Sequence, residues 1–266
     1  MTNIAILGAA GRMGQALVRC AGRLTAVRVV AALEQTGHAA MGRDAGTLAG
    51  VGHLGVPLTD NADAAGSADA LIDFTFHTAA PGNVAQACRL GKAMVIGTTG
   101  LDEDETRAVR AAAARIPIVW APNMSLGVNL LFAMAARAAA VLGLDYDVEI
   151  IETHHRHKQD APSGTALRLA EKIAEGRGQN LADALTHGRT GFVGERPRGQ
   201  IGMHAVRAGD AVGDHTVIFA TEGERLELGH RATSRDALAM GALRAAIWVA
   251  DRKPGLYDMQ DVLGLA

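Results

Sequence analysis

The sequence predicts an α/β protein with a doubly wound parallel sheet, followed by a second region with a different strand pattern. Short apolar strands alternate with helical segments over residues 3–120, and this alternation is typical of a parallel sheet covered by helices on both faces. A glycine-rich turn joins the first strand to the first helix. After Gly191 the chain changes to short alternating runs separated by Gly and Asp, which predicts antiparallel strands and hairpins.

The first strand, expected over residues 3–7, runs into the spacing G-x-x-G-x-x-G, formed by Gly8, Gly11 and Gly14. Glycines in such a turn let the backbone approach a pyrophosphate. A second strand over residues 27–33 ends at Glu34, where an acidic residue can bind the hydroxyls of an adenosine ribose. Together these features predict a Rossmann-type dinucleotide-binding unit, although Glu34 alone could also be a solvated loop acid.

Further strands are expected over residues 70–74, 93–96 and 116–120, with helices over residues 79–90 and 102–114 between them. Residues 37–60 are rich in glycine and predict a loop with at most a short turn of helix. In such sheets, ligands bind at the carboxyl ends of the strands. Residues 74–75, 97–99 and 121–124 follow strands and are therefore candidates for the nicotinamide half of a cofactor, although Thr and Gly are also ordinary turn residues.

A long helix over residues 126–142 and a strand over residues 147–153 lead into the most informative segment, E-T-H-H-R-H-K-Q-D-A-P-S-G-T-A-L at 152–167. Its histidines can exchange protons near neutral pH, and its Arg and Lys attract a carboxylate. A helix then begins near Gly164, and its first N–H groups lie at the positive end of the helix dipole. The segment predicts proton transfer to an anionic substrate.

Two simpler interpretations of this segment stay open. A run of basic residues is often a solvated loop. Histidines three apart can also bind zinc, but no Cys is nearby and no H-E-x-x-H pattern occurs, so we expect no metal. Beyond it, strands are expected over residues 200–206, 215–220 and 225–228 and a helix over residues 235–249, whereas the tail over residues 254–265 is short and mixed.

The composition narrows the class of protein. Among the 266 residues, 48% are hydrophobic and 20% are charged, which indicates a globular chain. The formal net charge of −2 and an aromatic content of 3% argue against a nucleic acid or an anionic membrane as the partner. Two cysteines without metal or redox spacing predict a reduced, cytoplasmic protein. No apolar run was expected to reach the ~18 residues of a membrane span.

With these motifs placed, the chain resembles the dihydrodipicolinate reductase family over essentially its whole length, and the segment H-H-R-H-K-x-D-A-P-S-G-T-A is close to diagnostic. The resemblance implies that NADH or NADPH reduces a small cyclic dicarboxylate, 4-hydroxy-tetrahydrodipicolinate, with loss of water in lysine and diaminopimelate biosynthesis. It implies a Rossmann-type dinucleotide-binding domain over 1–125 plus 235–266. It also implies an α+β domain for substrate binding and oligomerisation over 126–234, built on an open mixed sheet and forming a homotetramer.

The resemblance also assigns roles to individual residues. His154 is the implied general acid, and Lys158 is a second proton donor or charge partner. Substrate contacts are implied for His155, Gly164 and Thr165. Cofactor contacts are implied for Gly8, Ala9, Ala10, Gly11, Arg12, Met13, Glu34, Gly97, Thr98, Thr99, Ala121, Pro122, Asn123 and Met124.

One residue departs from the family pattern. Many members carry an Arg after the acid of the second strand, where it binds the 2'-phosphate of NADPH, but this chain has Gln35. We therefore expect NADH to be used at least as well as NADPH. Two alternatives share the glycine turn: another Rossmann-type amino-acid dehydrogenase, and a regulator that senses NAD(H) without turnover. Neither has a need for the histidine-rich segment.

Overall fold

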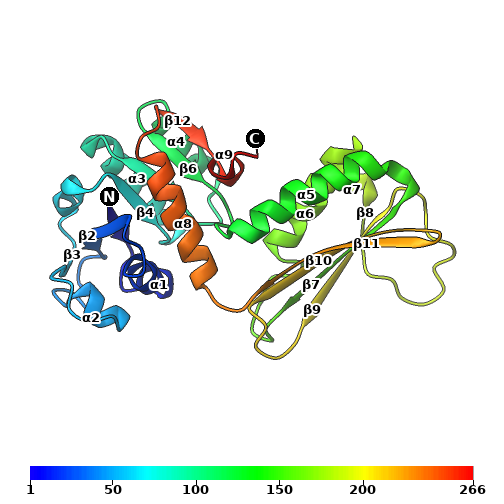
Figure 1. The fold of residues 1–266 in the computed structure, drawn as a ribbon, viewed down its shortest axis with the longest axis horizontal. Helices are drawn as coiled ribbons and strands as arrows, with labels where there is room; N and C mark the ends of the chain where they lie inside the picture. Colours follow the sequence, from blue (N-terminus) through cyan, green and yellow to red (C-terminus); the bar gives the residue numbers. More distant parts are fainter. Residues whose placement is uncertain (266) are drawn as a thin grey trace. The chain divides into compact units, whose positions relative to one another are not determined.

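The computed structural model describes residues 1–265, which form two compact units (Figure 1). Unit 1 contains Met1–Leu126 together with the chain from Arg235 onward, and unit 2 contains Gly127–Ser234. Unit 1 is therefore discontinuous in sequence, with unit 2 inserted between its two parts. The roles assigned to the two regions from the sequence stay predictions at this point.

Unit 1 is built on a parallel sheet of seven strands in the order β12-β6-β5-β4-β1-β2-β3. Neighbouring strands pair in parallel across the whole sheet. The parallel Rossmann-type sheet expected from the sequence is thus confirmed. The strands are β1 (Thr2–Leu7), β2 (Val27–Leu33), β3 (Leu58–Thr59), β4 (Ala70–Asp73), β5 (Ala93–Ile96), β6 (Pro117–Trp120) and β12 (Gly255–Tyr257).

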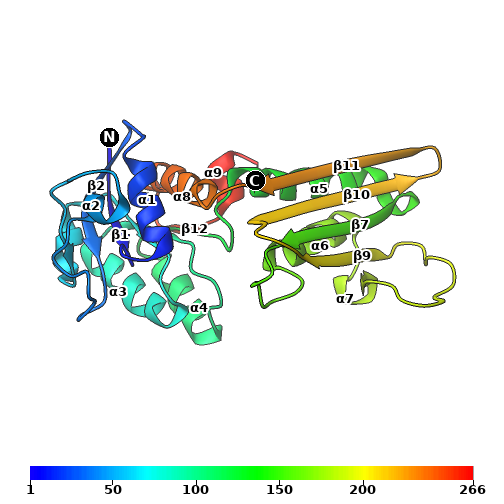
Figure 2. The same ribbon diagram turned by 90° about the horizontal axis from the view of Figure 1, so that it is seen from below.

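Helices cover both faces of this sheet (Figure 2). Alternate residues of β1 point to opposite faces, so that Ile4 and Ile6 join one apolar core and Ala5 and Leu7 join the other. The first core is closed by α1 (Arg12–Ala21) and α8 (Asp236–Val249), and the second by α3 (Ala80–Leu90) and α4 (Glu103–Ala112). Shorter elements are α2 (Ala45–Ala49), α9 (Met259–Leu263) and the 3₁₀ turns η1 (Ala62–Ser67) and η2 (His77–Ala79).

Unit 2 is built on a mixed sheet of five strands in the order β11-β10-β7-β9-β8. β7, β10 and β11 pair antiparallel, whereas β9 lies parallel to both β7 and β8. The open mixed sheet is confirmed. The strands are β7 (Asp147–His154), β8 (Leu185–His187), β9 (Ile201–Arg207), β10 (Gly213–Thr221) and β11 (Glu224–Ala232).

The expectation that residues 200–206 form an antiparallel strand is wrong in its direction. The chain leaves β7 and returns through α6 (Gly164–Arg177) and α7 (Leu181–Ala184) to β8, and the loop at 188–200 then carries it back to the start of β9. Crossover connections of this kind bring each next strand back parallel to the one before it. The sequence pattern marks a strand but not the path by which the chain reaches it.

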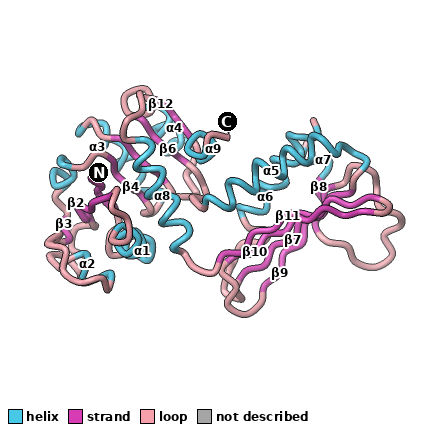
Figure 3. The backbone as a smooth tube through the Cα atoms, viewed as in Figure 1, coloured by secondary structure: helices cyan, strands magenta, loops and turns pink. Residues whose placement is uncertain are grey.

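The helices of unit 2 lie on one face of its sheet (Figure 3). α5 (Leu126–Leu142) and α6 pack on Val148, Ile150 and other apolar residues of this face, which form a single core. The residues that alternate with them, among them Glu149 and Ile151, are only half-buried. Among the described residues, no helix of unit 2 packs on the other face of this sheet.

The length of α5 corrects the expectation that no apolar segment reaches the length of a membrane span. Together with the 3₁₀ turn η3 (Gly143–Asp145), it makes a helix of 20 residues whose mean hydropathy of 1.7 would suit a membrane span by length and composition. Its buried residues, including Leu131 and Phe132, belong to the core of unit 2. A helix that packs in a core also carries such a composition, and here the contacts are those of a core helix.

Candidate active site

The turn after β1 shapes the first candidate site, which lies in unit 1. Gly8 has a φ of +70°, a conformation that L side chains rarely adopt. Gly11 is the N-cap of α1 and has no side chain to bond the first N–H groups of the helix. The positive end of α1 is therefore open toward an anion. These features fit the pyrophosphate of a dinucleotide.

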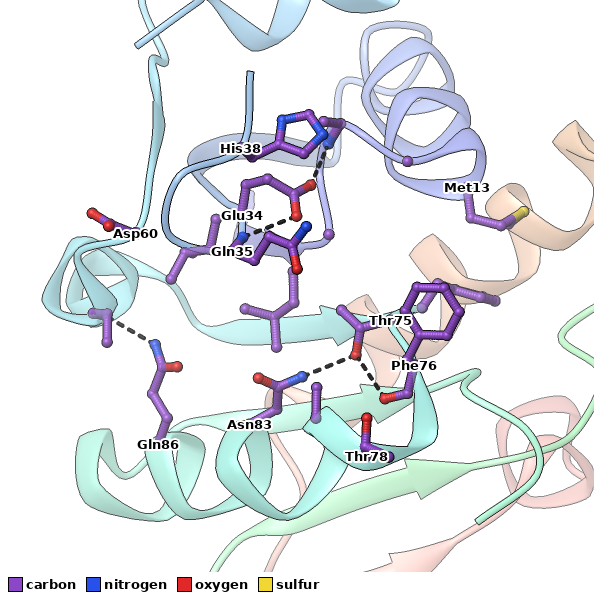
Figure 4. A pocket seen from close by; sticks show the side chains of 18 of the residues that line it. Met13, Glu34, Gln35, His38, Asp60, Thr75, Phe76, Thr78, Asn83 and Gln86 are labelled. Carbon is purple, nitrogen blue, oxygen red and sulfur yellow. Dashed lines mark hydrogen bonds between the residues drawn. The ribbon is translucent and has the colours of Figure 1, made fainter. Parts of the chain in front are cut away.

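A cavity of about 720 Å³ lies beside this turn (Figure 4). Six of the predicted cofactor residues line it, namely Gly8, Ala10, Gly11, Arg12, Met13 and Glu34. Sequence reasoning did not name several other lining residues, because only the fold brings their loops together. These include His38, Asp60, Phe76, Thr78, Asn83 and Gln86.

Glu34 is fixed at the end of β2 by two backbone donors. Its carboxylate accepts hydrogen bonds from the N–H of Ala10 at 3.1 Å and from that of Gln35 at 2.9 Å. It thereby ties the glycine turn to the strand that carries the acid. A carboxylate held in this position can accept hydrogen bonds from ribose hydroxyls.

A second carboxylate, which sequence reasoning missed, organises the ends of β4 and β5. Asp73 is fully buried and accepts hydrogen bonds from the N–H and hydroxyl of Thr75, from Asn83 and from the hydroxyl of Thr98, at 2.7–3.0 Å. Because the carboxylate joins two strands and α3, it fixes the floor of the cavity. The sequence feature that could have identified Asp73 is a single acidic residue at the end of an apolar strand.

Of the predicted nicotinamide segments, Phe74 and Thr75 line the cavity, whereas residues 97–99 and 121–124 are not among its lining residues. Gly97 packs under the ring of Phe74, and a Cβ at residue 97 would approach that ring to 2.2 Å. Thr98, Ala121 and Met124 are buried, and Thr99 is exposed. The segments lie at the carboxyl ends of β5 and β6, on the same edge of the sheet as the glycine turn. Their contacts with a cofactor stay predictions.

The histidine-rich segment forms the second candidate site, which lies in unit 2. His154 ends β7 with 8% of its surface exposed, and its Nδ1 lies 2.5 Å from Glu152 Oε2. Glu152 is fully buried and is held by both terminal nitrogens of Arg207 at 2.8 Å. Burial raises the pKa of Glu152, but the hydrogen bonds from Arg207 and His154 outweigh burial and hold its pKa below the ordinary value.

The helix after this segment begins as the sequence indicates. Ser163 is the N-cap of α6, and its hydroxyl accepts a hydrogen bond from Ala166 N–H at 3.2 Å. Gly164 and Thr165 form the first turn. Their N–H groups lie at the positive end of a helix of 14 residues, a position that favours an anion.

The basic residues between β7 and α6 are also placed by specific contacts. The ammonium of Lys158 lies 2.9 Å from Asp160, and this hydrogen bond holds the pKa of Asp160 below its ordinary value. The backbone N–H of His155 donates to Ala211 at 2.8 Å. The rings of His155 and His157 lie 6.2 Å apart. Among residues 1–265, no group of three or more His, Cys, Asp or Glu residues is placed to hold a metal ion.

His215, on β10, is a member of this site that sequence reasoning did not identify. Its Nε2 lies 3.0 Å from the hydroxyl of Ser163, and its ring lies edge-on to His154 at 5.2 Å between centroids. Burial, reinforced by the positive charge of His154, lowers the pKa of His215 to about 4. His215 is therefore neutral at physiological pH. No local sequence motif marks it, since only the pairing of β10 with β7 brings it here.

A neutral buried histidine predicts a pH dependence of stability. The unfolded chain protonates His215 near its ordinary pKa of 6.5, but the folded chain does so only near about 4. The free energy of unfolding should therefore fall by up to about 3 kcal/mol from this group as the pH drops from 6.5 to 4. Urea unfolding of wild type and His215→Gln at several pH values should show a flatter profile for the variant.

The exposed His187 provides the control for this experiment. His187→Gln should leave the slope of stability against pH as in wild type, because the side chain of His187 is exposed. Equal slopes for the His215→Gln protein and wild type would contradict the assignment of a neutral His215.

The fold and the two sites define the class of the protein as an oxidoreductase that uses a nicotinamide dinucleotide, with a glycine turn in one unit and a proton-transfer cluster in the other. Comparison with known families makes the assignment specific. The model for the N-terminus of dihydrodipicolinate reductase matches residues 2–124, and the model for its C-terminus matches residues 127–263. The chain belongs to the dihydrodipicolinate reductase family, which confirms the resemblance seen in the sequence.

Individual relatives agree with this membership. The chain is 54% identical to a 4-hydroxy-tetrahydrodipicolinate reductase of Alkalilimnicola ehrlichii over 266 residues, which is 99% of each chain. It is 53% identical to that of Anaeromyxobacter dehalogenans strain 2CP-1, over 100% of this chain and 98% of the relative. Both relatives thus match over essentially their whole length.

Solved structures share the fold. A dipicolinate-bound dihydrodipicolinate reductase from Paenisporosarcina sp. TG-14 is 25% identical with a TM-score of 0.77, covering 98% of both chains. GenD2 from gentamicin A biosynthesis, in complex with NAD, is 16% identical with a TM-score of 0.62, over 99% of this chain and 90% of that one. At 16% identity the second likeness shows the fold alone.

Proposed function

We propose that this enzyme reduces 4-hydroxy-tetrahydrodipicolinate to tetrahydrodipicolinate, with loss of water, in lysine and diaminopimelate biosynthesis. The observation that carries the proposal is the buried pair of His154 and Glu152 beside the first turn of α6. This arrangement puts a proton donor next to a site for a carboxylate. NADH or NADPH serves as the reductant and, when bound, supplies a hydride.

The cofactor is held by unit 1. The open end of α1 faces the pyrophosphate, and the carboxylate of Glu34 accepts hydrogen bonds from the adenosine ribose. Thr75, which Asp73 fixes in the cavity wall, lies toward the dihydronicotinamide half. The segments at 97–99 and 121–124, on the same sheet edge, complete the binding residues in this proposal.

Unit 2 binds the substrate and supplies the proton. Reduction of a conjugated imine leaves an electron-rich atom that must be protonated, and His154 donates this proton. Lys158 balances the negative charge that the dicarboxylate brings and can serve as a second donor. His155, together with the N–H groups of Gly164 and Thr165, binds the carboxylates.

The proposed domain boundaries follow from this assignment of cofactor binding to unit 1 and substrate binding to unit 2. Residues 1–125 plus 235–266 bind the dinucleotide, and residues 126–234 bind substrate and form the contacts of a homotetramer. The proposed tetramer contacts are supported by one face of the unit 2 sheet, on which no helix of unit 2 packs among the described residues. The half-buried Ile151 and Ile218 lie on this face. A protein with this biosynthetic role works in the cytoplasm.

The reaction itself is tested by following absorbance at 340 nm with freshly generated 4-hydroxy-tetrahydrodipicolinate and each reduced cofactor. We expect oxidation of the cofactor that requires the substrate and that pyridine-2,6-dicarboxylate inhibits, because this planar dicarboxylate presents the same two anionic groups. Cofactor binding without turnover would contradict the proposed reaction. It would favour another Rossmann-type dehydrogenase or a regulator that senses NAD(H).

Cofactor choice gives a second prediction. Gln35 lines the cavity beside Glu34 and carries no charge, so it offers a 2'-phosphate no ion pair, and the Glu34 carboxylate repels that group. We expect kcat/KM with NADH to be at least equal to that with NADPH. Gln35→Arg should raise kcat/KM for NADPH about tenfold or more, since a bidentate guanidinium suits a phosphate.

Gln86→Arg is the matched control for this substitution. It adds the same charge to the lining of the same cavity, on α3 instead of at the end of β2. A clear preference of the wild-type enzyme for NADPH, or an equal gain from both substitutions, would contradict the role given to Gln35.

A further inference from the structure

Glu152 accepts four hydrogen bonds within the second site. Its two oxygens accept hydrogen bonds from His154 Nδ1 at 2.5 Å, from Ser163 N–H at 3.1 Å and from Arg207 at 2.8 Å twice. A buried carboxylate without such partners would cost several kcal/mol. Here one carboxylate connects the end of β7, the start of α6 and the strand β9.

The sheet register explains why Arg207 can reach it. β7 and β9 are parallel, with His154 opposite Arg207 and Glu152 opposite Ala205. The guanidinium therefore extends back along the strand to Glu152 and also donates to the backbone oxygen of Asp160 at 2.6 Å. Its planar fork holds both oxygens of Glu152, which fixes the carboxylate plane.

We propose that Glu152, held by Arg207, is a positioning residue for His154. A carboxylate at Nδ1 keeps a proton on that nitrogen and orients the ring, so the transferable proton is carried by Nε2. Residue 213 is glycine, and a Cβ there would lie 3.0 Å from Nε2, so any larger residue would crowd this nitrogen. The proposal rests on the function proposed above, in which His154 is the proton donor.

The charges around His154 favour the same conclusion. Glu152 on its own strand is the nearest anion, and Arg207 on β9 binds that anion directly. From β10, the neutral His215 faces the ring and adds no positive charge near neutral pH. In the loop after β7, Lys158 and Asp160 pair with each other. Glu152 is thus the anion that directly contacts the ring of His154.

The role of Glu152 also links proton donation to substrate binding. Its Oε1 accepts the N–H of Ser163, the N-cap of α6, while its Oε2 binds His154. One rigid carboxylate therefore sets the distance between the proton donor and the first turn of α6. The contact with His154 is local along β7, whereas residues 152 and 163 meet through the loop between them.

Glu152→Gln tests the proposal because it keeps the shape of the side chain and removes the charge. We expect kcat to fall about 10- to 100-fold at pH 7.5 with KM changed less than about threefold. The alkaline limb of the profile of kcat against pH should move to lower pH, because a protonated imidazole loses its counter-ion. A wild-type pH profile in the folded variant would overturn the proposal.

Glu149→Gln is the matched control. Glu149 lies on the same strand but on the opposite face, and it too is held by two arginines and a histidine, namely Arg189, Arg196 and His204. The control removes a comparable ion pair and should leave kcat and the pH profile unchanged. An equal loss of kcat in both variants would mean that only stability is affected, and would overturn the proposal.

If Glu152→Gln does not fold, a second variant, Arg207→Lys, tests the same proposal. Arg207→Lys keeps the charge but cannot bind both oxygens of Glu152. We expect a severalfold lower kcat with little change in KM, and a pH profile that shifts less than expected for Glu152→Gln. Unchanged kcat in this variant would overturn the role of the guanidinium.

Two further measurements separate this proposal from the function on which it rests. In a His154→Gln background, Glu152→Gln should cause no additional loss of kcat, since Glu152 acts through His154. Long-range ¹H–¹⁵N spectra of histidine-labelled protein should show a proton on Nδ1 of His154 in wild type and a mixture of tautomers in Glu152→Gln. Identical spectra would overturn the positioning role, whereas full activity of His154→Gln alone would overturn only the proton-donor role.

Discussion

Replacing His154 with glutamine is expected to lower kcat at least about 100-fold while KM changes little, which is the usual range for a general acid. His154 is 8% exposed and is fixed by Glu152, so its ring is already oriented for one task. Glutamine is polar and similar in length, but it cannot donate a proton at neutral pH. Steady-state kinetics with the better reduced cofactor gives the measurement.

Two comparisons make this result specific. The cofactor should bind the variant as tightly as it binds wild type, because the cavity beside the glycine turn belongs to unit 1 and His154 to unit 2. His187→Gln should retain normal kcat, since His187 is exposed on the edge strand β8, which β9 separates from β7. A His154→Gln protein with kcat within about threefold of wild type would remove His154 from the proton-donor role.

The second large effect is expected from Gly14→Ala. A Cβ at residue 14 would lie 2.3 Å from the carbonyl oxygen of Gly8 and 2.6 Å from the Cα of Ala9. Both are backbone atoms, so no side-chain rotation can relieve the clash. The turn and α1 must separate, and we expect a loss of about 3 kcal/mol or more in the free energy of unfolding, together with weak cofactor binding.

Denaturant unfolding and the fluorescence change on NADH binding measure the two effects. Gly82→Ala is the control, because residue 82 lies in a helix, α3, with nothing within 4 Å of the added carbon. This change should be neutral or should stabilise by about 0.5–1 kcal/mol. Wild-type stability and cofactor affinity in Gly14→Ala would show that the glycine spacing of the turn is not needed.

The sequence predicted those parts of the molecule that depend on neighbouring residues. The glycine turn, Glu34 and the start of α6 near Gly164 are local patterns, because each motif is complete within one loop and the element next to it. The same holds for β1, β2, β4, β5 and β6, whose apolar runs are short and well separated, whereas the two-residue β3 lies in the segment expected to be a loop. These features could be identified before any contact between distant segments was known.

The residues that sequence reasoning missed depend on pairing between distant strands. Arg207 and His215 reach the second site only because β9 and β10 flank β7. β12, of three residues, is too short to give a pattern and is defined by its pairing with β6. For the same reason, the alternation of apolar and polar residues in β9 predicts a strand but does not predict the direction of that strand in the sheet.

The insertion of unit 2 has a consequence for synthesis on the ribosome. α8 covers one face of the unit 1 sheet, yet it is translated only after the 108 residues of Gly127–Ser234. At about 5–20 residues per second, this takes roughly 5–20 s. During that time Ile4, Ile72 and Val95 lack their final cover, so the nascent chain exposes an apolar surface that a holding chaperone would bind. The contiguous unit 2 can complete its fold first, and the nucleotide site is finished last.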